Sequence, residues 1–210
     1  HNGYERNTTP FTESLDNFTK FSTVQSCGTA TAVSVPCMFS NMKRTNYDET
    51  KAKNSSSLVD VVKYAGYDVA WYDNDGGCKG VCDRIPNEDL LPSDPEFKGL
   101  CSSDSCYDEV LLKRLHTRVA KAAKNKKSTV IFLHLIGSHG PTYFQRLPDD
   151  KKVFKPSCER SDIENCSVEQ IVNSYDNTLY YTDYILSKVV DELKPYEKDF
   201  GTAMFYISDH

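Results

Sequence analysis

Three apolar segments of the chain are each followed directly by polar side chains that could bind a metal ion or an anion. Asp209 and His210 follow the last of these segments, and an adjacent aspartate and histidine can supply two ligands to one zinc ion. Such a pair is a weak signal by itself, because polar residues also commonly end a strand. The other candidates are Asp75 and Lys79 after the first segment and His139 after the second.

A possible nucleophile lies in the run Ser-Cys-Gly-Thr-Ala-Thr-Ala-Val-Ser-Val-Pro, residues 26–36, which opens with small side chains and continues as an apolar helix. A threonine at a helix N-terminus lies where backbone N–H groups and the helix dipole favour an anion. If a divalent metal also binds its oxygen, the hydroxyl becomes a nucleophile near neutral pH. Thr29 is therefore a candidate nucleophile, although Ser26, Thr29 and Thr31 could each simply cap the helix.

The histidines differ in their surroundings. His139 is framed by glycines and followed by a proline, so we expect a turn that holds its imidazole outward, as a functional histidine requires. His116 falls on a predicted helix face, where a structural or solvated role is the simpler interpretation. His134 lies inside a predicted strand, where we expect a satisfied core or sheet-edge histidine. His1 begins the chain and supports no inference.

Eight cysteines form four close pairs along the chain. Nearest-neighbour pairing is an inference, because eight cysteines allow 105 connectivities. Zinc ribbons require CxxC knuckles and none of these spacings is CxxC, whereas an even count in local pairs favours disulfides formed in an oxidising compartment. Each short loop would then contribute roughly 2–3 kcal/mol. The expected pairs are Cys27/Cys37, Cys78/Cys82, Cys101/Cys106 and Cys158/Cys166.

Helices and strands are predicted to alternate, which indicates an α/β sandwich with a largely parallel central sheet flanked by helices. The sites of such sheets lie beyond the carboxyl ends of the strands, so the three polar segments should converge. We expect helices over 56–65, 107–123 and 168–193, buried strands over 68–72 and 202–207, and a central strand over 129–136. The expected buried stripe of the last helix is Val168, Ile171, Val172, Tyr175, Leu179, Thr182, Ile185, Leu186, Val189 and Leu193.

Length and composition set wider limits. The 210 residues fit a single domain that can bury about 70% of its unfolded surface. A net charge of -5, with no dense Lys/Arg cluster, argues against nucleic acid as a partner. No stretch reaches the roughly 20 apolar residues of a membrane span. Because the chain begins without methionine, we expect it to be part of a longer protein. We also expect the protein to be a monomer.

The motifs together resemble a known family. Residues 26–40, 73–80 (Asp-Asn-Asp-Gly-Gly-Cys-Lys-Gly), 137–143 (Gly-Ser-His-Gly-Pro-Thr-Tyr) and 206–210 (Tyr-Ile-Ser-Asp-His) are similar to those of the lipid A phosphoethanolamine transferases, which include the colistin-resistance enzymes of Gram-negative bacteria. The segments 2–10 and 174–178 resemble the same family, so the similarity runs the length of the chain.

The resemblance implies an alkaline-phosphatase or sulfatase-like fold. It implies a catalytic domain on the periplasmic face of the inner membrane, tethered by an N-terminal membrane domain. It implies transfer of phosphoethanolamine from phosphatidylethanolamine to lipid A, with one zinc ion or two. Thr29 matches the nucleophile, and Thr29, Asp209 and His210 match zinc ligands. His139 matches a residue that binds the phosphate or a second zinc.

Two further points concern the completeness of the site. Asp75 and Lys79 match a substrate-contacting loop, but Asp75 stands where some members carry asparagine. The family's glutamate ligand lies upstream of Asn2 and a further histidine ligand lies beyond His210, so we expect only part of the metal site here. Two other functions remain open: a hydrolase of the same superfamily, and a metal-free, disulfide-rich extracellular binding module.

Overall fold

The computed structural model describes residues 4–210, so the first residues of the 2–10 motif lie outside the described part. The chain forms two compact units, and each unit combines three separate stretches. We call residues 21–89, 115–134 and 196–210 the sheet unit, and residues 4–20, 90–114 and 135–195 the helical unit. Among residues 4–210, no helix combines the length and the apolar character that crossing a membrane requires.

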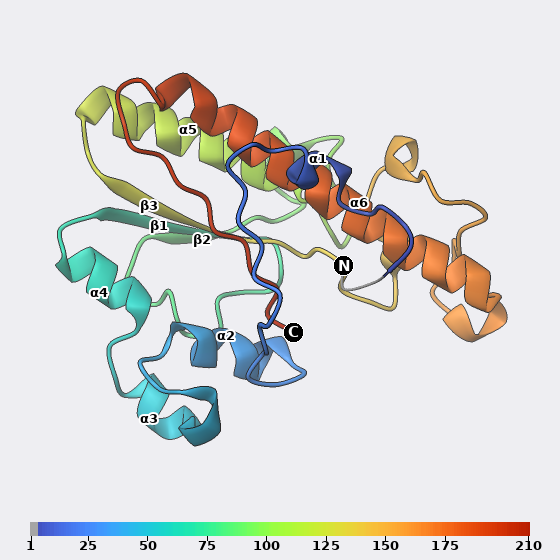
Figure 1. Ribbon diagram of the computed structural model, residues 1–210, viewed down its shortest axis with the longest axis horizontal. Coiled ribbons are helices and arrows are strands. Elements are labelled where there is room, and N and C mark those ends of the chain that lie inside the picture. The colour runs from blue at the N-terminus through green and yellow to red at the C-terminus, as the bar shows by residue number, and fades with distance from the viewer. Residues whose placement is uncertain (1–3) are drawn as a thin grey trace. The chain divides into compact units, whose positions relative to one another are not determined.

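The sheet unit contains three parallel strands in the order β2-β1-β3 (Figure 1). The central strand β1 (Asp68–Asp73) pairs with β2 (Asn87–Asp89) on one side and with β3 (Thr129–His134) on the other. This arrangement confirms the predicted parallel sheet and the strand expected over 68–72. The sequence did not indicate β2, because its three residues are all polar.

Two strand predictions are wrong. Residues 202–207 form no strand among the described residues, and instead of being buried their aromatic side chains are exposed, Phe205 to 91%. The physical reason is that the segment does not pair with β3, so within residues 4–210 its backbone makes no hydrogen bonds to a neighbouring strand. For the same reason β3 is an edge strand rather than a central one, and all six of its residues are only partly buried.

Helices cover both faces of this sheet (Figure 1). The helices α2 (Thr31–Phe39) and α4 (Leu58–Tyr64) lie on one side, and the C-terminal half of α5 (Glu109–Asn125) lies on the other. Trp71 of β1 stacks on Phe132 of β3 with ring centroids 5.4 Å apart. The apolar core on the α2 and α4 side consists of Val35, Val59, Val69, Trp71, Cys78, Val81, Cys82 and Ile85.

Local sequence signals account for the helix bounds. Ser57 and Asp60 form a capping box at the start of α4, each side chain bonding the other's backbone N–H. The residue that follows its C-cap, Gly66, has φ of +92°, a conformation that favours glycine at a helix end. Both the α4 and α5 helices are therefore confirmed within a few residues. A further short helix, α3, spans Glu49–Lys53.

The helical unit is built around α6 (Val168–Leu193), whose bounds match the prediction. A capping box between Ser167 and Gln170 begins it. The short helix α1 (Pro10–Glu13) packs on it, with the buried carboxylate of Asp183 accepting the backbone N–H groups of Phe11 and Thr12. Over the whole chain, short 3-10 turns occupy Arg44–Asn46, Pro95–Phe97, Tyr143–Gln145, Asp149–Lys151, Ile163–Asn165 and Lys194–Tyr196.

The predicted buried face of α6 is wrong in its N-terminal half. Val168, Val172 and Tyr175 are exposed, whereas the polar Asn173, Ser174, Asp176 and Asn177 are buried. These polar side chains are buried because they bond other segments of the unit. Asn177 both accepts from the backbone N–H of Phe154 at 2.8 Å and donates to its carbonyl at 2.9 Å. The C-terminal half follows the prediction, with Ile185, Leu186 and Val189 buried.

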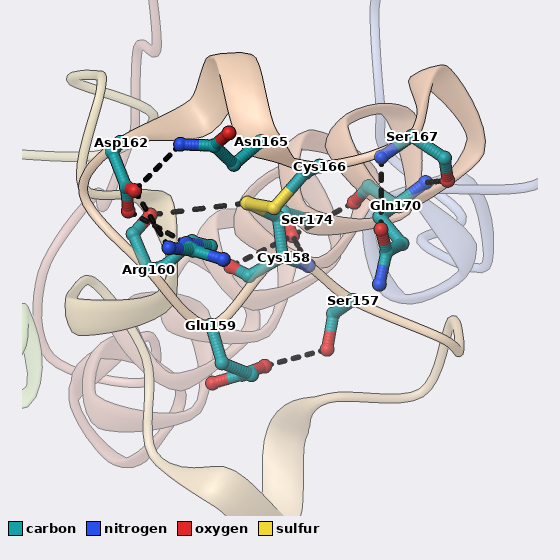
Figure 2. Close-up of a disulfide and its surroundings, with 10 residues drawn as sticks. All are labelled: Ser157, Cys158, Glu159, Arg160, Asp162, Asn165, Cys166, Ser167, Gln170 and Ser174. Atoms are coloured by element: carbon teal, nitrogen blue, oxygen red, sulfur yellow. Dashed lines mark hydrogen bonds and ion pairs between the residues drawn. A yellow bond between two sulfur atoms is a disulfide. The ribbon is translucent and has the colours of Figure 1, made fainter.

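All four expected disulfides are present: Cys27–Cys37, Cys78–Cys82, Cys101–Cys106 and Cys158–Cys166. Figure 2 shows the last of these, which closes the exposed loop before α6. Within that loop Arg160 pairs with Asp162 through two bonds of 2.6 Å, and Asn165 donates to the same carboxylate. The backbone N–H of Cys158 donates to the hydroxyl of Ser174, which joins the loop to the helix.

Candidate active site

Thr29 lies directly before the N-terminus of α2. The N-cap residue is Ala30, whose backbone is extended and whose side chain cannot cap. The Thr29 side chain is exposed, and among the described residues its hydroxyl has no hydrogen-bond partner. None of the hydroxyls of Ser26, Thr29 and Thr31 caps the helix, so the capping interpretation is wrong for all three. The N–H groups that begin α2 therefore have no side-chain cap, and they follow Thr29 directly in the chain.

A hollow of about 80 Å³ joins this turn to the last residues of the chain. It is lined by two stretches of the sheet unit, one from Val24 to Cys27 together with Ser34 and Met38, and the other from Ile207 to Asp209. Asp209 is thereby brought against the segment that carries Thr29. Thr29 itself is not among the lining residues.

One oxygen of Asp209 lacks a partner. Its Oδ1 accepts from the backbone N–H of His210 at 3.1 Å, while Oδ2 is buried and has no hydrogen bond among the described residues. The His210 Nε2 lies 3.6 Å from that Oδ2 atom, which is too long for a hydrogen bond. A buried carboxylate oxygen without a donor is costly unless a cation or another donor fills the gap.

Asp75 and Lys79 lie in the loop that follows β1. Lys79 adopts a left-handed backbone, with φ of +52°, and its ammonium group donates to the carbonyl of Gly76 at 2.8 Å. The Cys78–Cys82 disulfide closes the same loop. Asp73, the last residue of β1, accepts the backbone N–H groups of Asp75 and Gly77, both at 2.8 Å. The loop is therefore fixed to the end of the strand by a single carboxylate.

That carboxylate also bonds His134. Asp73 and His134 are register partners at the ends of β1 and β3, and His134 Nδ1 lies 2.7 Å from Asp73 Oδ2. The other ring nitrogen lies 3.7 Å from a carboxylate oxygen of Asp75. His134 is thus a satisfied sheet-edge histidine, as predicted, but the sequence did not reveal that it supports the Asp75 loop. Knowledge of the strand register would have been needed to find it.

The pair shifts the acidity of both groups. Burial raises the pKa of the Asp73 carboxyl, but the hydrogen bond and charge of His134 and the other donors outweigh it, and the pKa lies at about 2. Burial lowers the pKa of His134, whereas the hydrogen bond to Asp73 and the charges of Asp73 and Asp75 raise it. The pKa of His134 therefore lies above its usual range, which favours an imidazolium between two carboxylates.

His139 belongs to the helical unit, where it is exposed at a turn, as predicted. Two residues that the sequence analysis missed hold this turn. Asp108, fully buried, accepts the backbone N–H groups of Ile136 and Gly137 at 2.9 and 3.0 Å. Arg146 donates from Nε to the carbonyl of His139 at 2.9 Å. His116 is exposed on α5, in agreement with its predicted place on a helix face.

Comparison with known proteins identifies the family. The family model described as Sulfatase matches residues 1–210. The chain belongs to the Sulfatase family. Within it, the chain is 47% identical over 208 residues to phosphoethanolamine transferase EptA of Salmonella typhimurium (strain LT2), a match that covers 99% of the chain and 37% of the relative. It is 36% identical over 213 residues to phosphatidylethanolamine transferase Mcr-1 of Escherichia coli, covering all of the chain and 39% of the relative.

A solved structure agrees with this assignment. The soluble domain of lipooligosaccharide phosphoethanolamine transferase A from Neisseria meningitidis superposes with a TM-score of 0.82 at 43% identity, covering 91% of this chain and 56% of that one. The sulfatase-like fold and the resemblance to phosphoethanolamine transferases are thereby confirmed. The Sulfatase-family chain spans less than two fifths of the curated relatives that it matches, 37% and 39% of their lengths.

Three described residues of this Sulfatase-family chain carry donors whose chemistry suits a metal ion. The unpaired Asp209 Oδ2, the adjacent His210 imidazole and the uncapped Thr29 hydroxyl are hard or borderline donors of the kind that zinc accepts. Cys78, Cys82 and Asp83 also lie close together, but both sulfurs belong to a disulfide and have no lone thiolate to offer. Asp209, His210 and Thr29 are therefore the candidates for the metal.

Proposed function

We propose that this chain is part of the catalytic domain of a zinc-dependent phosphoethanolamine transferase, in which Thr29 is the covalent nucleophile. The observation that carries the proposal is the hollow lined by both Asp209, whose buried Oδ2 has no hydrogen bond among the described residues, and the turn of Thr29 before the uncapped N-terminus of α2. The names of the relatives support the transferred group, since EptA is named a phosphoethanolamine transferase and Mcr-1 a phosphatidylethanolamine transferase.

The donor would be phosphatidylethanolamine and the acceptor a phosphate of lipid A. In the first step the Thr29 oxygen attacks the donor phosphorus in line and loses its proton. The bond from phosphorus to the diacylglycerol oxygen breaks, and that oxygen takes up a proton. In the second step a lipid A phosphate oxygen attacks the phosphorus of the phosphoethanolamine–threonine ester, the bond from phosphorus to the Thr29 oxygen breaks, and that oxygen takes up a proton.

The chain's own residues would orient these steps. The first-turn N–H groups of α2 would face an anion bound at its N-terminus, and Lys79 would bind oxygens of the phosphoryl group as they gain charge. One zinc ion or two, held by Thr29, Asp209 and His210 in the first site, would lower the pKa of the hydroxyl and offset the phosphate charge.

The same proposal places the protein in the bacterial inner membrane with this domain facing the periplasm. A solved neighbour, 43% identical over 92% of this chain, is the integral membrane protein EptA from Neisseria meningitidis, of which this chain covers 35%. Four disulfides agree with an oxidising compartment. Phosphoethanolamine adds a cationic amine to lipid A, so transfer should reduce binding of the cationic polymyxins and confer colistin resistance.

Substitution of Thr29 tests the proposal. Cells that express the full-length protein with Thr29→Ala should show no phosphoethanolamine on lipid A by mass spectrometry, a loss of at least about 100-fold, because the attacking oxygen is gone. Thr31→Ala removes a hydroxyl two residues along, in the first turn of α2, and should leave modification intact. Persistent modification by Thr29→Ala would show that another group is the nucleophile.

Two measurements on the same preparations, of the Thr29 adduct and of bound zinc, distinguish a transferase from a hydrolase and from a metal-free binding module. A transferase should carry a phosphoethanolamine adduct on the Thr29 peptide that lasts in water until an acceptor arrives, whereas a hydrolase should release phosphoethanolamine without an acceptor. Zinc should co-purify with the full-length protein and fall with Asp209→Ala. A metal-free preparation would instead favour the extracellular binding module.

A further inference from the structure

We propose that Ser34 is a positioning residue for the nucleophile, because it clamps the turn that carries Thr29 to the first turns of α2. The proposal rests on the proposed function, in that it takes Thr29 as the attacking residue. Ser34 lies within α2 and is 1% exposed, so its hydroxyl cannot rely on water for hydrogen bonds. A buried hydroxyl of this kind normally has partners that determine where they lie.

Both partners of Ser34 are on one residue. The Ser34 Oγ accepts from the backbone N–H of Gly28 at 3.2 Å and donates to the carbonyl of Gly28 at 3.0 Å. Gly28 immediately precedes Thr29 in the chain. The two bonds therefore fix the peptide groups on both sides of Gly28 relative to the axis of α2, and with them the point from which the Thr29 side chain projects.

Other contacts close the same turn. The hydroxyl of Ser26 also donates to the Gly28 carbonyl, at 2.8 Å, and the Cys27–Cys37 disulfide ties the turn to the far end of α2. A Cβ atom added at Gly28 would lie 3.2 Å from a methyl group of Val33 and 3.9 Å from the Ser34 oxygen. The turn therefore approaches the helix closely, and only a residue without a side chain fits there with little adjustment.

The clamp matters because the Thr29 side chain makes no contact among the described residues that would hold it in place, so its position depends on the turn. Its side chain is exposed, and among residues 4–210 its hydroxyl has no hydrogen-bond partner. In-line attack requires the oxygen to stand within a fraction of an ångström of its reactive position. Ser34 also lines the hollow that contains Asp209, so the same serine that holds the turn borders the place where the candidate metal ligand lies.

The test compares Ser34→Ala with Ser40→Ala in the full-length protein, using phosphatidylethanolamine as the donor. Ser40 is a matched control at the opposite end of α2, since its hydroxyl likewise donates to one backbone carbonyl, of Cys37, and accepts from one N–H, of Met42. Ser34→Ala should lower kcat and the rate of adduct formation on Thr29 by about 10- to 100-fold, with KM little changed. Ser40→Ala should keep kcat within about twofold, at a similar small loss in Tm.

Two further variants sharpen the outcome. Ser34→Thr keeps the hydroxyl and should restore most of the rate, which a simple loss of packing would not explain. Gly28→Ala leaves Ser34 in place but presses the turn away from α2, so it should lower kcat as Ser34→Ala does, and it serves if Ser34→Ala fails to accumulate as folded protein. Wild-type kcat in a folded Ser34→Ala, or in Gly28→Ala, would overturn the positioning role.

A parallel measurement on Thr29→Ala distinguishes a failure of the proposed nucleophile from a failure of the proposed Ser34 role. If Thr29→Ala still transfers phosphoethanolamine, the proposed nucleophile is wrong and the role of Ser34 falls with it. If Thr29→Ala is inactive while Ser34→Ala turns over at the wild-type rate, the nucleophile stands and only the clamp is wrong. Loss of rate in both, with Ser40→Ala normal, is the result expected.

Discussion

At the scale of single residues, Asp73 and His134 form a short hydrogen bond at the carboxyl end of the sheet. Asp73 is 2% exposed and binds the histidine ring, the Trp71 indole and two backbone N–H groups of the Asp75 loop. Removing either partner leaves the other buried without its bond. The pair therefore couples the stability of the sheet unit, and of the loop with Asp75 and Lys79, to pH.

The pH dependence follows from the direction of each shift. The pKa of Asp73 falls from 3.8 to about 2 on folding, so its stabilisation is present above about 4 and is lost as the pH falls toward 2. The pKa of His134 rises above 6.5, so its stabilisation is present below 6.5 and is lost as the pH rises through the folded value. The pair should therefore stabilise the fold most between about pH 4 and 6.5.

Thermal unfolding measured against pH checks this prediction. The wild-type protein should lose Tm as the pH rises above 6.5, and His134→Gln, which has no ring to titrate, should lower Tm at pH 5 and show a flatter alkaline slope. His116→Gln, at an exposed histidine of α5, is the control and should follow the wild-type curve. An unchanged alkaline slope in His134→Gln would show that the pair does not govern it.

Residue types revealed the candidates but not their bonds. Asp209 and His139 could be chosen from the sequence because each follows an apolar segment, and Thr29 because it begins an apolar helix; each carries a reactive or ligating group. The contact between Asp73 and His134 joins positions 61 apart, and it depends on the pairing register of two strands. Ser34 is similar, because a serine inside a helix gives no local sign that both its partners belong to one glycine.

At the scale of elements, prediction succeeded where signals were local and failed where partners were distant. The bounds of α6 were predicted to the residue, because Ser167 and Gln170 mark its start and Pro195 its end. The segment 202–207 has the composition of a buried strand, but composition cannot supply a neighbouring strand. Likewise, the periodicity of α6 predicted an apolar buried face, whereas its N-terminal half buries polar groups that bond the loops around it.

Substitutions on α6 distinguish the two interpretations of its buried face. If apolar periodicity determined the face, Asn177→Leu would be neutral or stabilising. Because Asn177 satisfies both backbone groups of Phe154, we expect Asn177→Leu to lower the free energy of unfolding by about 2–3 kcal/mol. Val172→Ser, on the exposed face of the same half, should change it by less than about 0.5 kcal/mol. Urea unfolding followed by circular dichroism measures both.

At the scale of the whole molecule, each compact unit carries two disulfides. Cys27–Cys37 and Cys78–Cys82 belong to the sheet unit, and Cys101–Cys106 and Cys158–Cys166 belong to the helical unit. The loops they close are short, with sequence separations of 4 to 10, so each contributes about 2–3 kcal/mol by limiting the unfolded chain. The two bridges of the sheet unit also close the turns that carry Thr29 and Lys79, so they hold candidate site residues as well.

Pairwise removal of disulfides should therefore separate stability from activity. The double variants Cys27→Ser/Cys37→Ser and Cys158→Ser/Cys166→Ser remove bridges of similar sequence separation, 10 and 8, and each should lose about 2–3 kcal/mol of unfolding free energy. Only the first frees the turn that Ser34 clamps, so only the first should also lower kcat, by about tenfold or more. The Cys158–Cys166 bridge closes a loop in which Arg160 pairs with Asp162 and which carries no candidate site residue, so its loss should leave kcat unchanged below the unfolding temperature. Equal losses of kcat in the two variants, measured by lipid A mass spectrometry and donor turnover, would mean that activity follows global stability rather than the geometry of the Thr29 turn.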